Sequence, residues 1–320
     1  MTVYKLRNEV DLRDLWYEIN DSKSIVVYCG AGVTADRTGV GWAGLIDHVA
    51  TKLMQPSDFN FVESSQVCRQ SEENGRENLS SSFKSWDKYF NDETIPLEAK
   101  ATAAMSLAKN KDGTMDWDRL KKTFAQALYR DSGWHRGRTL PKLVDFIVIS
   151  AYMGKNVSII TTNYDTYIED AIGARLKSLD NSKKSKGVLQ FQGLEAKRWP
   201  PKLSWVAYNS SSSQKTDSGP DHGVPFSGDE ESSDIKIHYM HGRLPEKGEL
   251  CGSLVFSEKE YADSHDRTTE KLIEWFSGGP TIIVGTSLTD TPLVRSLLNI
   301  KRRDEASRAG IYAIMQRTIT

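Results

Sequence analysis

Four short clusters of glycine and polar residues are of the types that bind phosphates and sugars or move protons. The first, Gly30-Ala31-Gly32-Val33-Thr34-Ala35, follows an apolar run at residues 24–29. A strand, this glycine pattern and then a helix form the arrangement in which backbone N–H groups approach a pyrophosphate. Tight turns between a strand and a helix also recruit glycine. The pattern therefore predicts a dinucleotide site only in combination with other clusters.

The other three clusters also follow short apolar runs. They are Thr161-Thr162-Asn163-Tyr164-Asp165, Met240-His241-Gly242 and Gly285-Thr286-Ser287-Leu288. An asparagine amide can both donate to and accept from a ribose or a water molecule, and a histidine suits general-base chemistry because its ordinary pKa is about 6.5. The Thr161–Asp165 and Gly285–Leu288 clusters also have a structural interpretation, as a turn or as the cap of the next helix. For His241 the structural interpretation is that a lone histidine is more often a structural residue than a catalyst.

Apolar runs and helical spacing predict the elements that position these clusters. Strands are predicted at 24–29, 157–161, 203–208, 235–240, 281–285 and 311–315, and helices at 9–20, 42–54, 97–107, 117–129, 142–153, 166–179, 258–276 and 292–299. Alternation of strands and helices indicates an α/β fold, a Rossmann-like doubly wound parallel sheet with a mostly helical insertion. Because ligands bind at the carboxyl ends of parallel strands, we expect the four clusters to meet at one edge of the sheet.

Composition along the chain predicts its division into domains. We expect residues 1–55 and 135–320 to form the Rossmann-like domain, and residues 56–134 to form a helical insertion or small subdomain. Residues 180–234 are rich in Ser, Lys, Gly and Asp. We expect them to be a flexible polar insertion within the Rossmann-like part.

The bulk composition disfavours several classes of protein. Lys and Arg total 42 and Asp and Glu total 43, a formal net charge of −1, so nothing in the balance predicts binding to nucleic acid or to a membrane. No apolar run approaches the roughly 20 residues that a membrane-spanning helix needs, and the N-terminus lacks the apolar stretch of a signal peptide. We expect a soluble, cytoplasmic protein. The three cysteines cannot supply a four-cysteine zinc site, and no metal is predicted.

One missing residue argues against hydride-transfer chemistry. A dehydrogenase of the Rossmann type carries an acidic residue at the end of its second strand, about 20 positions after the glycine motif, for the ribose hydroxyls. Here that position falls in the predicted helix at 42–54.

Taken in order, the four motifs resemble those of the sirtuin family. GAGVT resembles the family's GAG-Ser/Thr loop, TTNYD its TQNID-type segment, MHG the strand end that carries its catalytic histidine, and GTSL its adenosine-binding loop. The resemblance implies that Asn163 holds the nicotinamide ribose or a water molecule and that His241 is the general base. It also implies that NAD is bound by Gly30, Ala31, Gly32, Thr34, Asp165, Gly285, Thr286 and Ser287.

Two departures from the protein-deacylating sirtuins narrow the expectation. The chain lacks the cysteines of their zinc ribbon, and Thr38-Gly39-Val40-Gly41-Trp42 stands where they carry a Pro-Asp-Phe-Arg segment. The pattern is closer to the bacterial sirtuin-like NAD hydrolases that act as antiphage effectors and deplete cellular NAD. We therefore expect an NAD glycohydrolase that releases nicotinamide and ADP-ribose. The alternatives are an NAD-dependent deacylase without the zinc ribbon and a non-catalytic NAD or ADP-ribose sensor.

An unregulated NAD hydrolase would poison its host. The predicted strand at 311–315 is followed by only a few residues. We therefore expect control by homo-oligomerisation, by a regulatory partner protein or by a further domain.

Overall fold

The computed structural model describes residues 11–54, 86, 88–110, 112–129, 137–186, 201–208, 234–252, 254–286, 288, 290–303 and 310–314. In this part of the chain the strands are β1 (Ser24–Cys29), β2 (Asn156–Thr161), β3 (Leu203–Ala207), β4 (Ile235–Tyr239), β5 (Thr281–Val284) and β6 (Ile311–Ile314). They form one six-stranded sheet in the order β3-β4-β2-β1-β5-β6, and every neighbouring pair is parallel. The predicted α/β fold with a Rossmann-like parallel sheet is confirmed.

The chain divides into two compact units. The first comprises Met1–Gly39, Asp131–Val255 and Ala262–Thr320, and it contains the sheet. The second comprises Val40–Arg130 and Phe256–Tyr261.

Strand β1 is central because its sequence is apolar on both faces. Val26 and Tyr28 belong to a buried cluster with Leu272 and Phe276, while the alternate residue Val27 is also buried. The sequence of a strand that is buried on both faces is a continuous run of apolar residues, whereas a half-exposed strand alternates apolar and polar residues. This is why the run at 24–29 was recognisable in the sequence.

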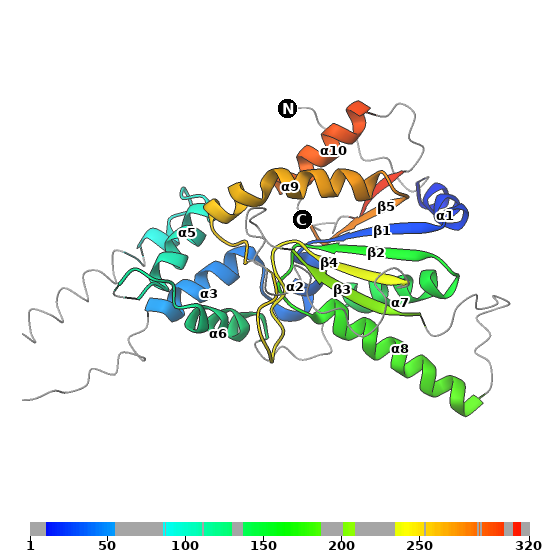
Figure 1. Cartoon of the computed structure of the whole chain (residues 1–320), viewed down its shortest axis with the longest axis horizontal. Helices are drawn as coiled ribbons and strands as arrows, with labels where there is room; N and C mark the ends of the chain where they lie inside the picture. Colours follow the sequence, from blue (N-terminus) through cyan, green and yellow to red (C-terminus); the bar gives the residue numbers. More distant parts are fainter. Residues whose placement is uncertain are drawn as a thin grey trace, which may run out of the picture. The chain divides into compact units, whose positions relative to one another are not determined.

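Helices cover both faces of the sheet (Figure 1). On one face lie α7 (Thr139–Tyr152) and α8 (Tyr167–Lys186). On the other lie α10 (Thr291–Arg303) and the part of α9 (Glu258–Phe276) that belongs to the first unit. Helix α1 (Asp11–Asp21) precedes β1.

This connectivity creates a switch point between β1 and β5. From β1 the chain passes through α2 (Gly32–Thr38) and the second unit to α7, on one face, before it enters β2. From the neighbouring strand β5 it passes to α10, on the other face. Connections that diverge to opposite faces open a crevice at the carboxyl ends of the two strands. The Gly30 turn follows β1 and the Gly285 turn follows β5.

One helix was not predicted, and two others extend well past their predicted ends. A short helix, α2 (Gly32–Thr38), begins inside the Gly30 motif and ends at Gly39, whose φ of 68° gives the left-handed cap that glycine adopts easily. The sequence pattern predicts the first helix after the motif only at 42–54. Helices α8 and α10 run on past the predicted ends at 179 and 299, because polar helix-forming residues continue them without an apolar periodicity.

The second unit is helical in its described residues. It contains α3 (Trp42–Met54), α5 (Leu97–Leu107) and α6 (Trp117–Leu128). Phe256 packs edge-on against Phe124 of α6 and Trp42 of α3, with ring centroids 4.6 and 5.0 Å apart. The Asp116 carboxylate caps α6 by accepting from the Arg119 N–H.

Among the described residues, no helix combines the length and the apolar character that crossing a bilayer requires.

Candidate functional site

The four predicted clusters follow four strands that are neighbours in the sheet. The strands β4, β2, β1 and β5 lie side by side, and they precede His241, Asn163, Gly30 and Gly285 respectively. Parallel strands end at the same edge, so the fold gathers residues that are far apart in the sequence.

The two glycine turns pack backbone to backbone. The Gly30 N–H donates to the Val284 carbonyl over 3.0 Å, and the Gly32 N–H donates to the Gly285 carbonyl over 2.7 Å. A Cβ on Gly30 would lie 2.6 Å from the Gly285 oxygen, and one on Gly285, whose φ is 70°, would lie 2.4 Å from the Val33 nitrogen. These glycines are therefore required by the contact between the turns.

This contact changes what the glycine motif means. The N–H groups of Gly30 and Gly32 donate to the carbonyls of Val284 and Gly285. This packing explains why glycine stands at both positions, without any bound ligand. Ala31 and Gly32 are the exposed residues of the first turn. In the second turn the Thr286 hydroxyl accepts from the Leu288 N–H over 3.2 Å, while Ser287 lies outside the described residues.

A buried hydrogen-bonded cluster joins the β1 and β2 turns. The Asn163 side-chain amide donates to the Thr34 hydroxyl over 3.2 Å, and the Thr34 hydroxyl donates to the Asp165 carboxylate over 3.2 Å. The backbone of Asn163 is fixed in turn, because its N–H donates to the hydroxyl of Thr161 over 3.0 Å. The predicted residues Thr34, Asn163 and Asp165 thus contact one another.

The two carboxylate oxygens of Asp165 accept hydrogen bonds from different segments. One carboxylate oxygen accepts from the Tyr167 N–H over 3.1 Å at the start of α8, as a helix cap does. The other oxygen accepts from Thr34. Burial raises the pKa of Asp165 to about 6, although the two hydrogen bonds and the nearby charge of Arg37 act to lower it.

His241 is buried at the end of β4, beside the Tyr164 ring, with the two ring centroids 6.4 Å apart. Burial lowers the pKa of His241 to about 4, and the charge of Asp290 and a hydrogen bond to the Thr162 backbone oppose that shift. The imidazole is therefore neutral at physiological pH. A neutral ring can accept a proton, as a general base must.

His238, which lies within β4 three residues before His241, provides a contrast. Its Nδ1 lies 2.9 Å from the Tyr208 hydroxyl, and its ring centroid lies 4.5 Å from that of Trp275 in α9. Burial lowers its pKa to about 3. It packs with the aromatic residues on the α9 face, whereas His241 contacts Tyr164 and Thr162 beyond the strand end.

Two charged residues of the site were missed by the sequence analysis. Arg37, in the last turn of α2, is buried with its guanidinium 4.1 Å from the centre of the Tyr167 ring. Asp290 accepts from the Tyr28 hydroxyl over 3.1 Å and from the Leu293 N–H at the start of α10. An aspartate before a helix is an ordinary cap signal, so only its proximity to His241 distinguishes it.

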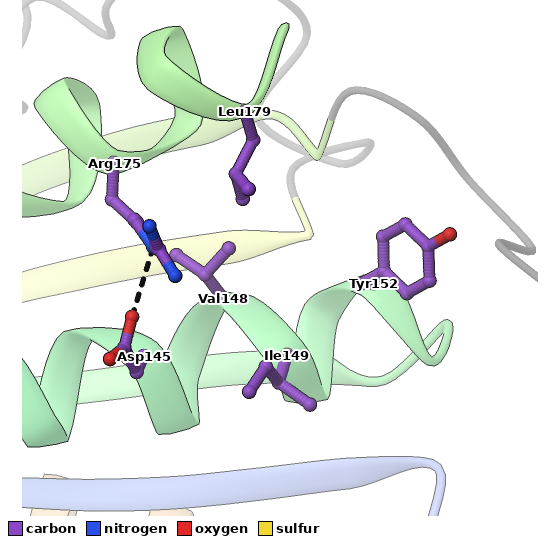
Figure 2. Close-up of a pocket in the computed structure, with 6 residues that line it drawn as sticks. All are labelled: Asp145, Val148, Ile149, Tyr152, Arg175 and Leu179. Carbon is purple, nitrogen blue, oxygen red and sulfur yellow. Dashed lines mark ion pairs between the residues drawn. The ribbon is translucent and has the colours of Figure 1, made fainter. Parts of the chain in front are cut away.

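A separate groove lies between α7 and α8 (Figure 2). It contains an ion pair, with Arg175 Nε 2.9 Å from Asp145 Oδ1. Its lining residues are Asp145, Val148, Ile149, Tyr152, Arg175 and Leu179, and none of them is a predicted site residue.

Within the described ranges, no three His, Cys, Asp or Glu side chains are grouped as metal ligands would be. Cys29 is buried, which raises the pKa of its thiol, and Cys251 is partly exposed; Cys68 lies outside the described residues.

Comparison with known proteins adds one match. A family model described as a SIR2-like domain matches residues 157–319. The chain belongs to the SIR2-like family. This confirms the sirtuin-like identity implied by the motifs, and it supports an NAD-related function of the sirtuin type. The matched residues of this SIR2-like chain run from β2 onward and include Asn163, Asp165 and His241, whereas the Gly30 turn precedes them. No curated protein matches the chain.

Proposed function

We propose that this SIR2-like protein hydrolyses NAD to nicotinamide and ADP-ribose. The observation that carries the proposal is the combination of a neutral, buried His241 with the Thr34–Asn163–Asp165 hydrogen-bond cluster on adjacent strand ends. Family membership supplies NAD as the expected substrate.

Hydrolysis of the nicotinamide–ribose bond requires the protein to position NAD and water and to supply one general base. The bond between the nicotinamide nitrogen and ribose C1′ breaks, and its electron pair leaves with the nitrogen, so nicotinamide departs neutral without a general acid. The transition state resembles an oxocarbenium ion, as in glycoside hydrolysis. A water oxygen then bonds to C1′ and loses a proton.

Each residue of the cluster has a role in this proposal. The Asn163 amide orients the ribose or the attacking water, and Thr34 and Asp165 hold that amide in place. His241 takes the proton from the water. A histidine with a pKa near 4 is a weak base, but the water becomes acidic once it bonds to the cationic ribose carbon.

The two glycine turns are assigned to the remainder of NAD. We place the diphosphate against the exposed Ala31 and Gly32, and the adenosine against Gly285, Thr286 and Ser287.

We also propose that the activity is regulated and serves antiphage defence by depleting NAD. The support is the resemblance to bacterial sirtuin-like hydrolases and the lack of zinc-ribbon cysteines. Self-assembly or binding of a regulatory partner would switch the enzyme on. Nicotinamide release measured over a range of protein concentrations tests the first mode of control.

The proposed activity is tested with purified protein and NAD. The wild type should release equal amounts of nicotinamide and ADP-ribose, and His241→Ala and Asn163→Ala should each lower the rate at least about 100-fold. The control is His238→Gln, a change to another buried histidine, within β4, which should retain the rate. Removal of acyl groups from peptides without NAD hydrolysis would identify a deacylase. Tight NAD binding without turnover in any assembly would identify a sensor.

A further inference from the structure

An ion pair next to the predicted site links the segment that carries His241 to the helix that follows Asp165. Arg243 Nε lies 2.8 Å from Glu169 Oε2, and Arg243 Nη2 lies 2.9 Å from Glu169 Oε1. The geometry is bidentate, and both side chains are only 12% exposed. Bidentate charge-assisted pairs are among the stronger and more directional polar contacts in proteins.

Aromatic residues hold this pair on two sides. The Arg243 guanidinium lies 4.1 Å from the centre of the Trp205 ring of β3, and the Tyr239 hydroxyl of β4 donates to Glu169 over 3.2 Å. Trp205 and Tyr239 are themselves buried. The pair therefore has one defined geometry, unlike an exposed ion pair, which samples several and contributes little.

The pair spans the two turns on which the proposed chemistry depends. Arg243 follows His241 after Gly242, whose φ is 93°. Glu169 lies in the first turn of α8, and the first N–H of that helix, at Tyr167, donates to Asp165. A backbone hydrogen bond joins the same two turns, from the Leu244 N–H to the Tyr164 carbonyl over 2.8 Å.

The segment around His241 has no regular secondary structure to hold it. The His241 carbonyl accepts from the Val255 N–H over 3.2 Å, and Arg243 and Cys251 exchange two backbone hydrogen bonds. These bonds close the loop upon itself. The Arg243–Glu169 pair is a side-chain contact that joins this loop to α8.

We propose that Arg243 and Glu169 are positioning residues that fix His241 relative to Asn163 and Asp165. The catalytic part of this inference rests on the proposed NAD hydrolysis, whereas the structural part does not. Neither residue touches the reacting atoms. Their effect is on geometry, and a misplacement of about 1 Å in a catalytic group is enough to cost about 100-fold in rate.

The test compares three single variants. Arg243→Lys keeps the charge but loses the bidentate fork and the flat surface that stacks on Trp205. Glu169→Gln keeps the shape but removes the charge. Arg175→Lys is the matched control, because Arg175 also pairs with a carboxylate, Asp145 at 2.9 Å, and stands on α8, yet its side chain is 39% exposed (Figure 2).

Two measurements are made on each variant. Nicotinamide release gives kcat and KM, and amide hydrogen exchange gives the protection of residues 162–170 and 239–252 with and without NAD. We expect Arg243→Lys and Glu169→Gln to lower kcat about 10- to 100-fold, to leave KM within about threefold and to speed exchange in both segments. The double variant should be no slower than the worse single variant, since the two residues act as a unit.

The two measurements separate the two proposals. Faster exchange in both variants, with a wild type that never cleaves NAD, would support the positioning contact and refute NAD hydrolysis. An active wild type, with variants that match Arg175→Lys in both kcat and exchange, would refute the positioning role. A fall in kcat without any change in exchange would also refute it, because the effect would not come from the loop.

Discussion

The Asn163 amide donates to the Thr34 hydroxyl over 3.2 Å and thereby joins the turn after β2 to the first turn of α2. The same hydroxyl donates to Asp165, so one oxygen atom connects two polar side chains that are both buried. The hydroxyl has a single proton, and the Ala31 carbonyl, at 3.5 Å, is the more distant acceptor. The Thr34 hydroxyl is thus the centre of the hydrogen-bonded cluster, and Thr34 is more than a part of the glycine motif.

Replacing Thr34 by valine should weaken both stability and turnover. Valine has the same shape but leaves Asn163 and Asp165 without their common partner, and an unsatisfied buried polar group costs about 1–3 kcal/mol. We expect a loss of that size in the free energy of unfolding and at least a tenfold slower release of nicotinamide. Thr34→Ser keeps the hydroxyl and should restore most of both. Denaturant unfolding and product analysis measure the two effects.

Replacing Gly285 by alanine should destabilise the first unit. A Cβ there would lie 2.4 Å from the Val33 nitrogen, and the φ of 70° costs an L residue about 1–2 kcal/mol by itself. We expect more than about 2 kcal/mol of lost unfolding free energy in a denaturant titration. Gly173→Ala in α8 is the control, because no atom lies within 4 Å of its Cβ and alanine favours a helix by about 1 kcal/mol. Equal stability of the two variants would contradict the contact between the glycine turns.

Replacing Asp165 by asparagine should stabilise the protein above about pH 6. The pKa of Asp165 rises from 3.8 to about 6 on folding, so the native state holds a proton that the unfolded state releases between those values. Stability from this group is fully present below pH 3.8 and is lost as pH rises through 6. The shift corresponds to about 3 kcal/mol.

The comparison is made by thermal or denaturant unfolding at pH 4 and pH 7.5. Asp165→Asn should exceed the wild type at pH 7.5 and approach it at pH 4, while NAD affinity, measured by calorimetry, should fall. A variant that is less stable than the wild type at pH 7.5 would show that the charged carboxylate stabilises the fold.

The buried histidines should make the protein less stable in acid. The pKa values of His238 and His241 fall from 6.5 to about 3 and about 4, so the unfolded state binds protons that the native state does not. Above pH 6.5 these histidines cause no loss of stability. Below pH 6.5 each histidine lowers the free energy of unfolding by about 1.4 kcal/mol per pH unit, until the pH reaches the pKa of that histidine in the folded state. His238→Gln should reduce the slope of stability against pH between 6 and 4 by about that amount. An unchanged slope would mean that His238 is protonated in the folded protein.

Most of the elements were predictable because they depend on local patterns. The run at 24–29 is apolar throughout and becomes β1, and the spacing of Leu45, Ile46 and Val49 places one face of α3 inside. The short helix α2 was missed because seven residues with a glycine at the start carry no periodicity. The ends of α8 and α10 were missed because polar residues continue a helix without any signal of burial.

The sequence by itself determined the four motifs and their positions after apolar strands, since a parallel sheet must bring the ends of its strands to one edge. It also determined the likeness to the sirtuin family. The tertiary structure decided which side chains meet. The contact of Thr34 with Asn163 spans 129 residues and that of Glu169 with Arg243 spans 74, and no local pattern specifies pairings at such separations. It also decided the protonation of Asp165 and His241, because burial shifts their pKa values and burial follows only from the packing of distant segments.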